Sequence, residues 1–265
     1  MQELFQNLWD DYGRLTPDAP QIQKVLTEQG EKTQNDHIAL RTFNRSPLRI
    51  NDVAKIFIKE GYRPQDQYVF EDKKLAATYF AHADGMLPKV FISELELEKC
   101  SAYLRGFCEK LVLEAEKNLS GRPLQIPARP WEKIAHRDYQ KLMAESEYAA
   151  WVSAYGLRAN HFTVLVNPLK TIRGIDALNA FLKARGFILN EKGGAVKGSE
   201  KDFLKQSSTM ARTIPWEFSD GKFEIASCYY EFAERFPLDK SGKLFQGFVT
   251  QSANKIFEST DIRKK

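Results

Sequence analysis

The sequence predicts an α+β fold in which two copies of a strand–helix–strands module form one central mixed sheet or half-barrel. An N-terminal helical segment precedes the modules, and a helical insert separates them. The main observation is an internal repeat, because a β-rich run that opens with a histidine and leads into a glycine-terminated helix occurs twice. The spacing agrees, with 24 residues from His37 to Gly61 and 25 from His161 to Gly186. Residues 97–157, between the copies, show helical periodicity instead.

The first 96 residues contain the N-terminal segment and the first module. Residues 1–34 are expected to be helical, because apolar side chains recur there at helical spacing on both sides of a proline-rich turn. In residues 35–96, the run 36–43 predicts a strand, and Asn51-Asp52 is expected to cap a helix that ends at Gly61. Three further strands are predicted at residues 67–70, 76–80 and 89–95.

The pattern of the first module returns after the insert. In the second module, residues 158–258, a strand at 160–166 precedes a helix that ends at Gly186. Two long strands are predicted to follow it, at 207–214 and 223–232. We expect the whole chain, residues 1–265, to form one domain.

Composition excludes several classes of protein. The chain has 265 residues, 43% hydrophobic and 28% charged, which fits a globular protein with its own core and excludes disordered, collagenous and disulfide-stapled classes. No apolar run is long enough to span a membrane, and the net charge of +4 is dispersed, so neither a membrane nor a nucleic acid is expected as partner. The first 15 residues carry acidic groups and lack the features of a signal peptide, and the three cysteines form no cluster. We therefore expect reduced thiols and a cytoplasmic location.

Two of the four histidines, His37 and His161, open the matching strands of the two modules. A pseudo-symmetric sheet can bring two first strands together at its centre, where the two imidazoles would converge. Two neutral imidazoles and one carboxylate form the facial arrangement that suits non-haem Fe(II) and leaves positions open. Glu231 is the candidate carboxylate, because a charged residue inside an aromatic strand is costly to bury unless it is paired or metal-bound.

Each of these residues also has a simpler interpretation. A strand histidine is often a core or edge residue, and it is the paired placement in the repeat that favours a ligand role. Glu231 could instead pair with Arg235 or face solvent. The remaining two histidines lie in polar surroundings and are not candidates.

Strand alternation adds two candidate substrate contacts. Arg41 lies four residues after His37 and therefore shares its face, where its guanidinium could bind a carboxylate through two hydrogen bonds. An exposed strand arginine is the alternative. Ser208 could contact a ligand, or its hydroxyl could be satisfied by the backbone.

Four motifs of this sequence resemble those of the 2-oxoadipate dioxygenase/decarboxylase family, also called hydroxyglutarate synthase, of the vicinal oxygen chelate superfamily. The resemblance covers about residues 1–258, as in a short-type member. The motifs are Asp36-His37-x-Ala39-Leu40-Arg41-Thr42-Phe43, Asn160-His161-Phe162-Thr163, Gln206-Ser207-Ser208-Thr209 and Tyr229-Tyr230-Glu231-Phe232. The resemblance implies two βαβββ modules with metal ligands at His37, His161 and Glu231. It further implies that Arg41 binds a substrate carboxylate and that a segment matching residues 248–257 places Gln251 and Ser252 near the substrate.

The resemblance implies an Fe(II) enzyme that converts 2-oxoadipate and dioxygen into 2-hydroxyglutarate and carbon dioxide, as in lysine catabolism. The substrate would contact His37, Arg41, Ser208, Gln251 and Ser252, with Arg41 fixing the distal carboxylate. The same ligand set accepts Zn or Ni, so either ion can replace iron in a purified sample.

Two other functions compete with this one. A glyoxalase-like isomerase or metal-dependent hydrolase would use a more complete ligand set, for which Glu94 is the candidate, and would consume no oxygen. Glu94 lies in an acidic stretch with Glu96 and Glu98, which also suits a solvated surface. The second competing hypothesis is a non-catalytic binding protein in which the histidines are structural.

Overall fold

The structure is a computed structural model that describes residues 1–250, and it confirms the predicted α+β fold. Its main feature is an eight-stranded mixed sheet with the order β2-β3-β4-β1-β5-β10-β7-β6. The strands of this sheet are β1 (Asn35–Phe43), β2 (Arg63–Phe70), β3 (Leu75–Ala81), β4 (Lys89–Leu95), β5 (Ala159–Leu165), β6 (Lys197–Ser199), β7 (Leu204–Ser208) and β10 (Tyr229–Arg235).

The sheet is pseudo-symmetric about its centre. In the first half the order outward is β1, β4, β3, β2, and in the second half it is β5, β10, β7, β6. In each half the first strand pairs in parallel with the last strand of its own module. The two halves join through the antiparallel pair β1–β5, which places His37 opposite Thr163 and Ala39 opposite His161. The predicted histidine-bearing strands are therefore neighbours.

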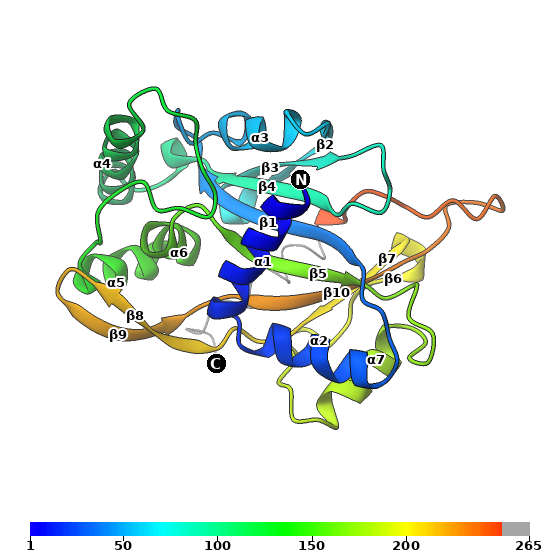
Figure 1. The fold of residues 1–265 in the computed structure, drawn as a ribbon. Coiled ribbons are helices and arrows are strands. Elements are labelled where there is room, and N and C mark those ends of the chain that lie inside the picture. The colour runs from blue at the N-terminus through cyan, green and yellow to red at the C-terminus, as the bar shows by residue number, and fades with distance from the viewer. Residues whose placement is uncertain (251–265) are drawn as a thin grey trace.

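Helices cover the face of the sheet that carries Ile38, which we call the helix face; the opposite face, which carries His37, is the site face. In Figure 1, α1 crosses the centre of the sheet, with α3 above it and α2 and α7 below. Tyr12 of α1 packs on Phe162 with 4.9 Å between ring centroids, and burying aromatic side chains of this kind stabilises the fold by about 1.5–3 kcal/mol each. The four helices are α1 (Gln2–Leu15), α2 (Asp18–Glu28), α3 (Ile50–Ile58) and α7 (Ile175–Lys183).

The insert between the modules contains three helices, which lie together beyond one end of the sheet (Figure 1): α4 (Ala102–Leu119), α5 (His136–Glu145) and α6 (Glu147–Tyr155). Helix α6 reaches the site face, where Tyr148 hydrogen-bonds to the backbone of Thr42 and Ser93. None of the helices within residues 1–250 combines the length and apolar character that a membrane crossing requires.

The predicted N-cap of α3 is wrong. The helix begins at Ile50, so Asn51 and Asp52 lie in its first turn, and no side chain of the preceding residue caps it. The carboxylate of Glu94, on β4, instead accepts a hydrogen bond from the Ile50 amide at 2.8 Å. A strand 44 residues away in sequence therefore satisfies this helix end. The predicted end is correct, because Gly61 has φ of +97° and Gly186, after α7, has φ of +81°.

The two long strands predicted in the second module are each divided. The run 207–214 contains the end of β7 and the start of β8 (Thr213–Phe218), and the run 223–232 contains the end of β9 (Gly221–Ala226) and the start of β10. Strands β8 and β9 form a separate two-stranded sheet. Sequence propensity is similar in both sheets, so only long-range pairing decides where one strand ends and the next begins. The short strand β6 was also not predicted.

Candidate metal centre

His37, His161 and Glu231 converge on the site face where the two modules meet. The first comes from β1, the second from β5 and the third from β10, and all three are at least 96% buried. One potential ligand atom of each lies within 4.8 Å of the others. Nε2 of His37 is 3.7 Å from Oε1 of Glu231, and Nε2 of His161 is 3.3 Å from Oε2 of the same carboxylate. The two imidazole rings meet edge to face, with centroids 5.4 Å apart.

The residue that precedes each histidine holds its imidazole. Oδ1 of Asp36 lies 2.8 Å from Nδ1 of His37, and Oδ1 of Asn160 lies 3.3 Å from Nδ1 of His161. A register shift between Asn35 and His37 gives β1 one extra residue opposite β5, as in a β-bulge, and this brings Asp36 beside its neighbour. Because both Nδ1 atoms are engaged, Nε2 is the nitrogen that faces Glu231 in both modules.

The electrostatics of the site depend on burial. Burial lowers the pKa of both His37 and His161, so both imidazoles are neutral near pH 7. Burial also raises the pKa of Glu231 to about 8, although the Nε2 of Gln206, 2.5 Å from Oε1 of Glu231, opposes that shift. Burial by itself raises the pKa of Asp36, but the adjacent Arg235 guanidinium outweighs it and holds that pKa well below its usual range.

These residues fit a divalent metal ion. Two neutral imidazoles present Nε2 beside one carboxylate, the donor set that Fe(II) and related ions accept. A cation among them would stabilise the charged carboxylate of Glu231 that burial disfavours. Oε1 of Gln206, beside Glu231, is buried and has no hydrogen-bond partner within residues 1–250, as expected beside a centre that also binds ligands.

Arg41 lies on the site face, two residues beyond Ala39 along β1. Its side chain is 1% exposed, and its Nη1 is 2.8 Å from Oε1 of Glu147 at the start of α6. The guanidinium also lies over the rings of Tyr148 and Trp151, 5.0 and 5.4 Å from their centroids. The arginine is thus a buried member of an ion pair, not the exposed strand arginine of the alternative interpretation.

Ser208 is fully buried and is paired with Glu231 across β7 and β10, so its side chain lies on the site face. Residues 245–248, which we call the C-terminal segment, also reach this face. The Phe248 ring meets the His37 ring edge to face at 4.8 Å. Nη1 of Arg235 donates to the carbonyl oxygens of Phe245 and Gly247, each at 2.9 Å. Two other predicted substrate contacts, Gln251 and Ser252, lie outside the described residues.

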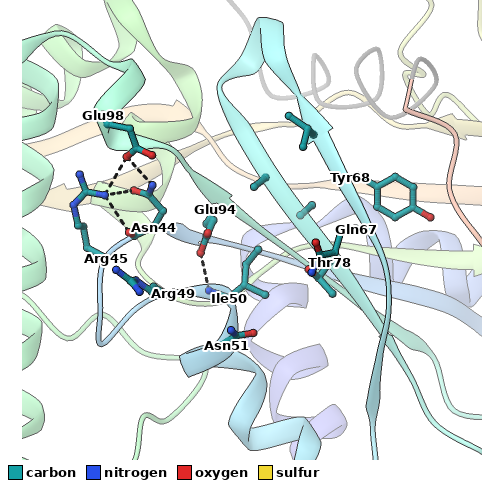
Figure 2. A pocket seen from close by; sticks show the side chains of 13 residues that line it. Asn44, Arg45, Arg49, Ile50, Asn51, Gln67, Tyr68, Thr78, Glu94 and Glu98 are labelled. Atoms are coloured by element: carbon teal, nitrogen blue, oxygen red, sulfur yellow. Dashed lines mark hydrogen bonds and ion pairs between the residues drawn. The ribbon is translucent and has the colours of Figure 1, made fainter.

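Glu94 does not join the triad. Its Cα partner on β1 is Thr42, out of phase with His37 and Arg41, so its side chain lies on the helix face. Figure 2 shows it pointing to the Ile50 amide, in a pocket of 540 Å³. Among the residues described, one set of three or more possible ligands lies close enough together to hold a metal, and it consists of His37, His161 and Glu231. Glu94, the extra ligand expected for an isomerase or hydrolase, therefore lies away from this centre.

Three residues of the site were missed from sequence: Asp36, Gln206 and Tyr229. The Tyr229 ring stacks on the His161 ring, with centroids 4.7 Å apart and 26° between planes. Side chains two residues apart on a strand share a face, so Gln206 lies on the face of Ser208 and Tyr229 on the face of Glu231. This alternation could have identified both residues from the sequence. The β-bulge that places Asp36 has no counterpart in the sequence pattern.

Comparisons with known proteins point to one family. A family model described as 2-oxoadipate dioxygenase/decarboxylase matches residues 2–120 and 113–246. The chloroplastic 2-oxoadipate dioxygenase/decarboxylase of Arabidopsis thaliana is 37% identical over 265 residues, which cover 90% of this chain and 71% of that protein.

Several solved structures share the fold of this chain. Hydroxyglutarate synthase from Oryza sativa in complex with 2-oxoadipate is 33% identical, with a TM-score of 0.90, over 98% of this chain and 92% of that one. A Shewanella frigidimarina protein with a provisional hydrolase designation is 44% identical, with a TM-score of 0.87, over 94% and 97% of the two chains. A glyoxalase superfamily protein from Ralstonia eutropha shares the fold at 22% identity, with a TM-score of 0.76 over 92% and 84%.

Proposed function

This chain belongs to the 2-oxoadipate dioxygenase/decarboxylase family, and from that membership we propose that it is an Fe(II)-dependent enzyme that converts 2-oxoadipate and dioxygen into 2-hydroxyglutarate and carbon dioxide. The observation that carries the proposal is the buried triad of His37, His161 and Glu231 at the junction of the two modules. The reaction balances, because the six carbons and seven oxygens of the two substrates reappear in the two products. Iron is proposed because the donor set is that of non-haem iron oxygenases.

When bound by His37, His161 and Glu231, Fe(II) would supply the redox-active centre that reaction of a 2-oxo acid with dioxygen requires. Asp36 and Asn160 hold the two imidazoles with Nε2 toward the centre. These contacts fix the tautomer of each ring before any ligand arrives. The carboxamide of Gln206 holds one oxygen of the third ligand in the same way.

We propose that the substrate lies along the site face of the sheet. The head of the 2-oxo acid lies at the triad beside His37 and Ser208, and its tail extends toward Arg41, which binds the distal carboxylate. The Phe248 ring, packed on His37, excludes water from one side of the head. Gln251 and Ser252 complete the predicted contacts. Positioning the tail in this way can lower the barrier by several kcal/mol.

A 2-oxo acid panel tests the function. Protein loaded with Fe(II) under nitrogen is mixed with oxygenated buffer and 2-oxo acids of four to six carbons, with and without a distal carboxylate. We expect 2-oxoadipate to give equal losses of dioxygen and gains of carbon dioxide, with 2-hydroxyglutarate identified by mass spectrometry. With ¹⁸O₂, that product should gain two labelled atoms. Conversion of a 2-oxo acid or thioester without oxygen uptake would instead support the isomerase or hydrolase.

Glu94→Gln is the matched control for this panel. It changes the carboxylate that the competing function would use, and it lies on the helix face. We expect its oxygen uptake to equal that of the unaltered protein.

The expected cytoplasmic location stays a prediction, since the Arabidopsis relative is named as a chloroplast protein.

A further inference from the structure

The hydroxyl of Tyr229 is a buried polar group with an unusual environment. Tyr229 is 0% exposed, and its hydroxyl has no hydrogen-bond partner within residues 1–250. An unsatisfied buried hydroxyl destabilises a folded protein, so such groups are rare and call for a ligand or water.

The hydroxyls of the other fully buried tyrosines differ from that of Tyr229 in their hydrogen bonding. Four described tyrosines share 0% exposure with Tyr229, and the hydroxyl of each has a protein partner. Their partners are Tyr229 O for Tyr12, Pro88 O for Tyr62, Ala226 O for Tyr155 and Gln23 Nε2 for Tyr230. Tyr230 is the neighbour of Tyr229 on β10 but projects to the helix face. Among residues 1–250, the fold thus supplies a partner to each of these four hydroxyls and none to the one on the site face.

The register of the sheet places Tyr229 in the row next to that of Glu231, on the side toward Arg41. His37, Thr163 and Glu231 form one row across β1, β5 and β10. The next row contains Ala39, His161 and Tyr229, and Arg41 lies two residues further along β1. The hydroxyl is also within electrostatic range of Glu231, Arg41 and Glu147.

Arg41 needs help to bind an anion. Its guanidinium already holds the carboxylate of Glu147 at 2.8 Å, so the pair carries no net charge. A second carboxylate in this place requires a further donor, and a neutral phenol supplies one without bringing another charge into a buried site.

We propose that the Tyr229 hydroxyl contacts the substrate and donates a hydrogen bond to the distal carboxylate of a bound 2-oxo dicarboxylic acid, beside Arg41. The inference rests on the proposed function. It makes Tyr229 a specificity-determining residue, because a 2-oxo acid without the distal carboxylate has no group there to accept the hydrogen bond.

Tyr229→Phe removes only this oxygen and keeps the ring that stacks on His161. Binding of 2-oxoadipate and of 2-oxohexanoate, which has the same length but no distal carboxylate, is measured by calorimetry on Fe(II)-loaded protein under nitrogen. We expect the Kd of 2-oxoadipate to rise at least tenfold and that of 2-oxohexanoate to change less than threefold. In steady state, KM for 2-oxoadipate should rise with kcat within threefold. An unchanged Kd, or equal losses for both acids, would overturn the proposal.

Thermal unfolding of the ligand-free protein separates this role from a structural one. Tyr229→Phe breaks no hydrogen bond to a described residue, so its Tm should equal that of the unaltered protein. Tyr155→Phe, which loses the bond to Ala226 O, should have a lower Tm and an unchanged Kd. If Tyr229→Phe lowers the Tm as much as Tyr155→Phe does, this result would count against the substrate role. If the unaltered protein binds 2-oxoadipate but does not oxidise it, the proposed reaction fails, and the calorimetric comparison still decides the role of Tyr229.

Discussion

Asp36 and His37 are neighbours in sequence and also hydrogen-bonded to each other, with Oδ1 of the carboxylate 2.8 Å from Nδ1 of the imidazole. The same carboxylate pairs with Arg235, whose Nη2 lies 2.8 Å from Oδ1. Arg235 also donates to two backbone carbonyls of the C-terminal segment. One buried ion pair thus connects a proposed metal ligand of the first module to the last strand of the second.

Removing this carboxylate should weaken metal binding. Asp36→Ala frees the imidazole of His37 to rotate, and losses of about 10- to 100-fold in metal affinity follow from removal of such partners. Competition with a chelator of known affinity measures the change. Because the variant also leaves Arg235 buried without its carboxylate, the free energy of unfolding should fall by about 3–5 kcal/mol. A metal affinity equal to that of the unaltered protein in a folded variant would contradict the positioning role.

Glu231→Gln should abolish stoichiometric metal binding while the fold is kept. The amide has the shape of the carboxylate but lacks its charge, and a divalent ion between two neutral imidazoles needs that charge. Metal content after loading and desalting should fall from one ion per chain to below a tenth. Removing metal with a chelator should lower the Tm of the unaltered protein and leave that of the variant unchanged. Full metal content in the variant would exclude Glu231 as a ligand.

Arg41→Ala should keep the metal and lose activity on 2-oxoadipate. The variant removes the proposed partner of the distal carboxylate, and a loss of about 100-fold in kcat/KM corresponds to about 2.7 kcal/mol of transition-state stabilisation. Arg45→Ala is the matched control, because this arginine pairs with Glu98 at 3.1 Å beside the pocket that contains Glu94. Unchanged kcat/KM for Arg41→Ala, at full metal content, would remove this arginine from substrate recognition.

Glu31 should make stability depend on pH in the acid range. Its buried carboxylate accepts backbone hydrogen bonds from Lys170, Thr171 and Ile172. Burial by itself raises the pKa of Glu31, but these bonds and that of the Thr171 hydroxyl outweigh it and lower the pKa to about 2. A lowered pKa means that the stabilisation is complete above the ordinary value near 4.5 and is lost as the pH falls toward 2.

Glu31→Gln should therefore cost about 2 kcal/mol of unfolding free energy at pH 7. The cost should shrink as the pH falls below 4.5, because the unaltered carboxylate then takes up a proton as well. Urea unfolding of both proteins at pH 7, 5, 4 and 3 measures the difference. A constant difference across this range would show that Glu31 acts through packing instead of charge.

Much of the architecture was predicted because it repeats. The histidine-to-glycine spacing identified both modules, and the strands that hold His37 and His161 are adjacent as predicted. Boundaries that depend on distant partners were not predicted: Glu94 caps α3 from another strand, and two predicted strands divide between two sheets. The division of the chain into a single domain with four segments stays a prediction.

The sequence by itself determined which residue types are available to the site and which strands carry them, because strand periodicity fixes the face on which each side chain lies. Only the tertiary structure decided how they are used. It turned Asp36 toward the imidazole through a bulge, placed Glu147 of the insert against Arg41, and left the Tyr229 hydroxyl without a described partner. Each of these depends on contacts between segments that are distant in the chain, or on a local irregularity that such contacts impose, and no local pattern encodes them.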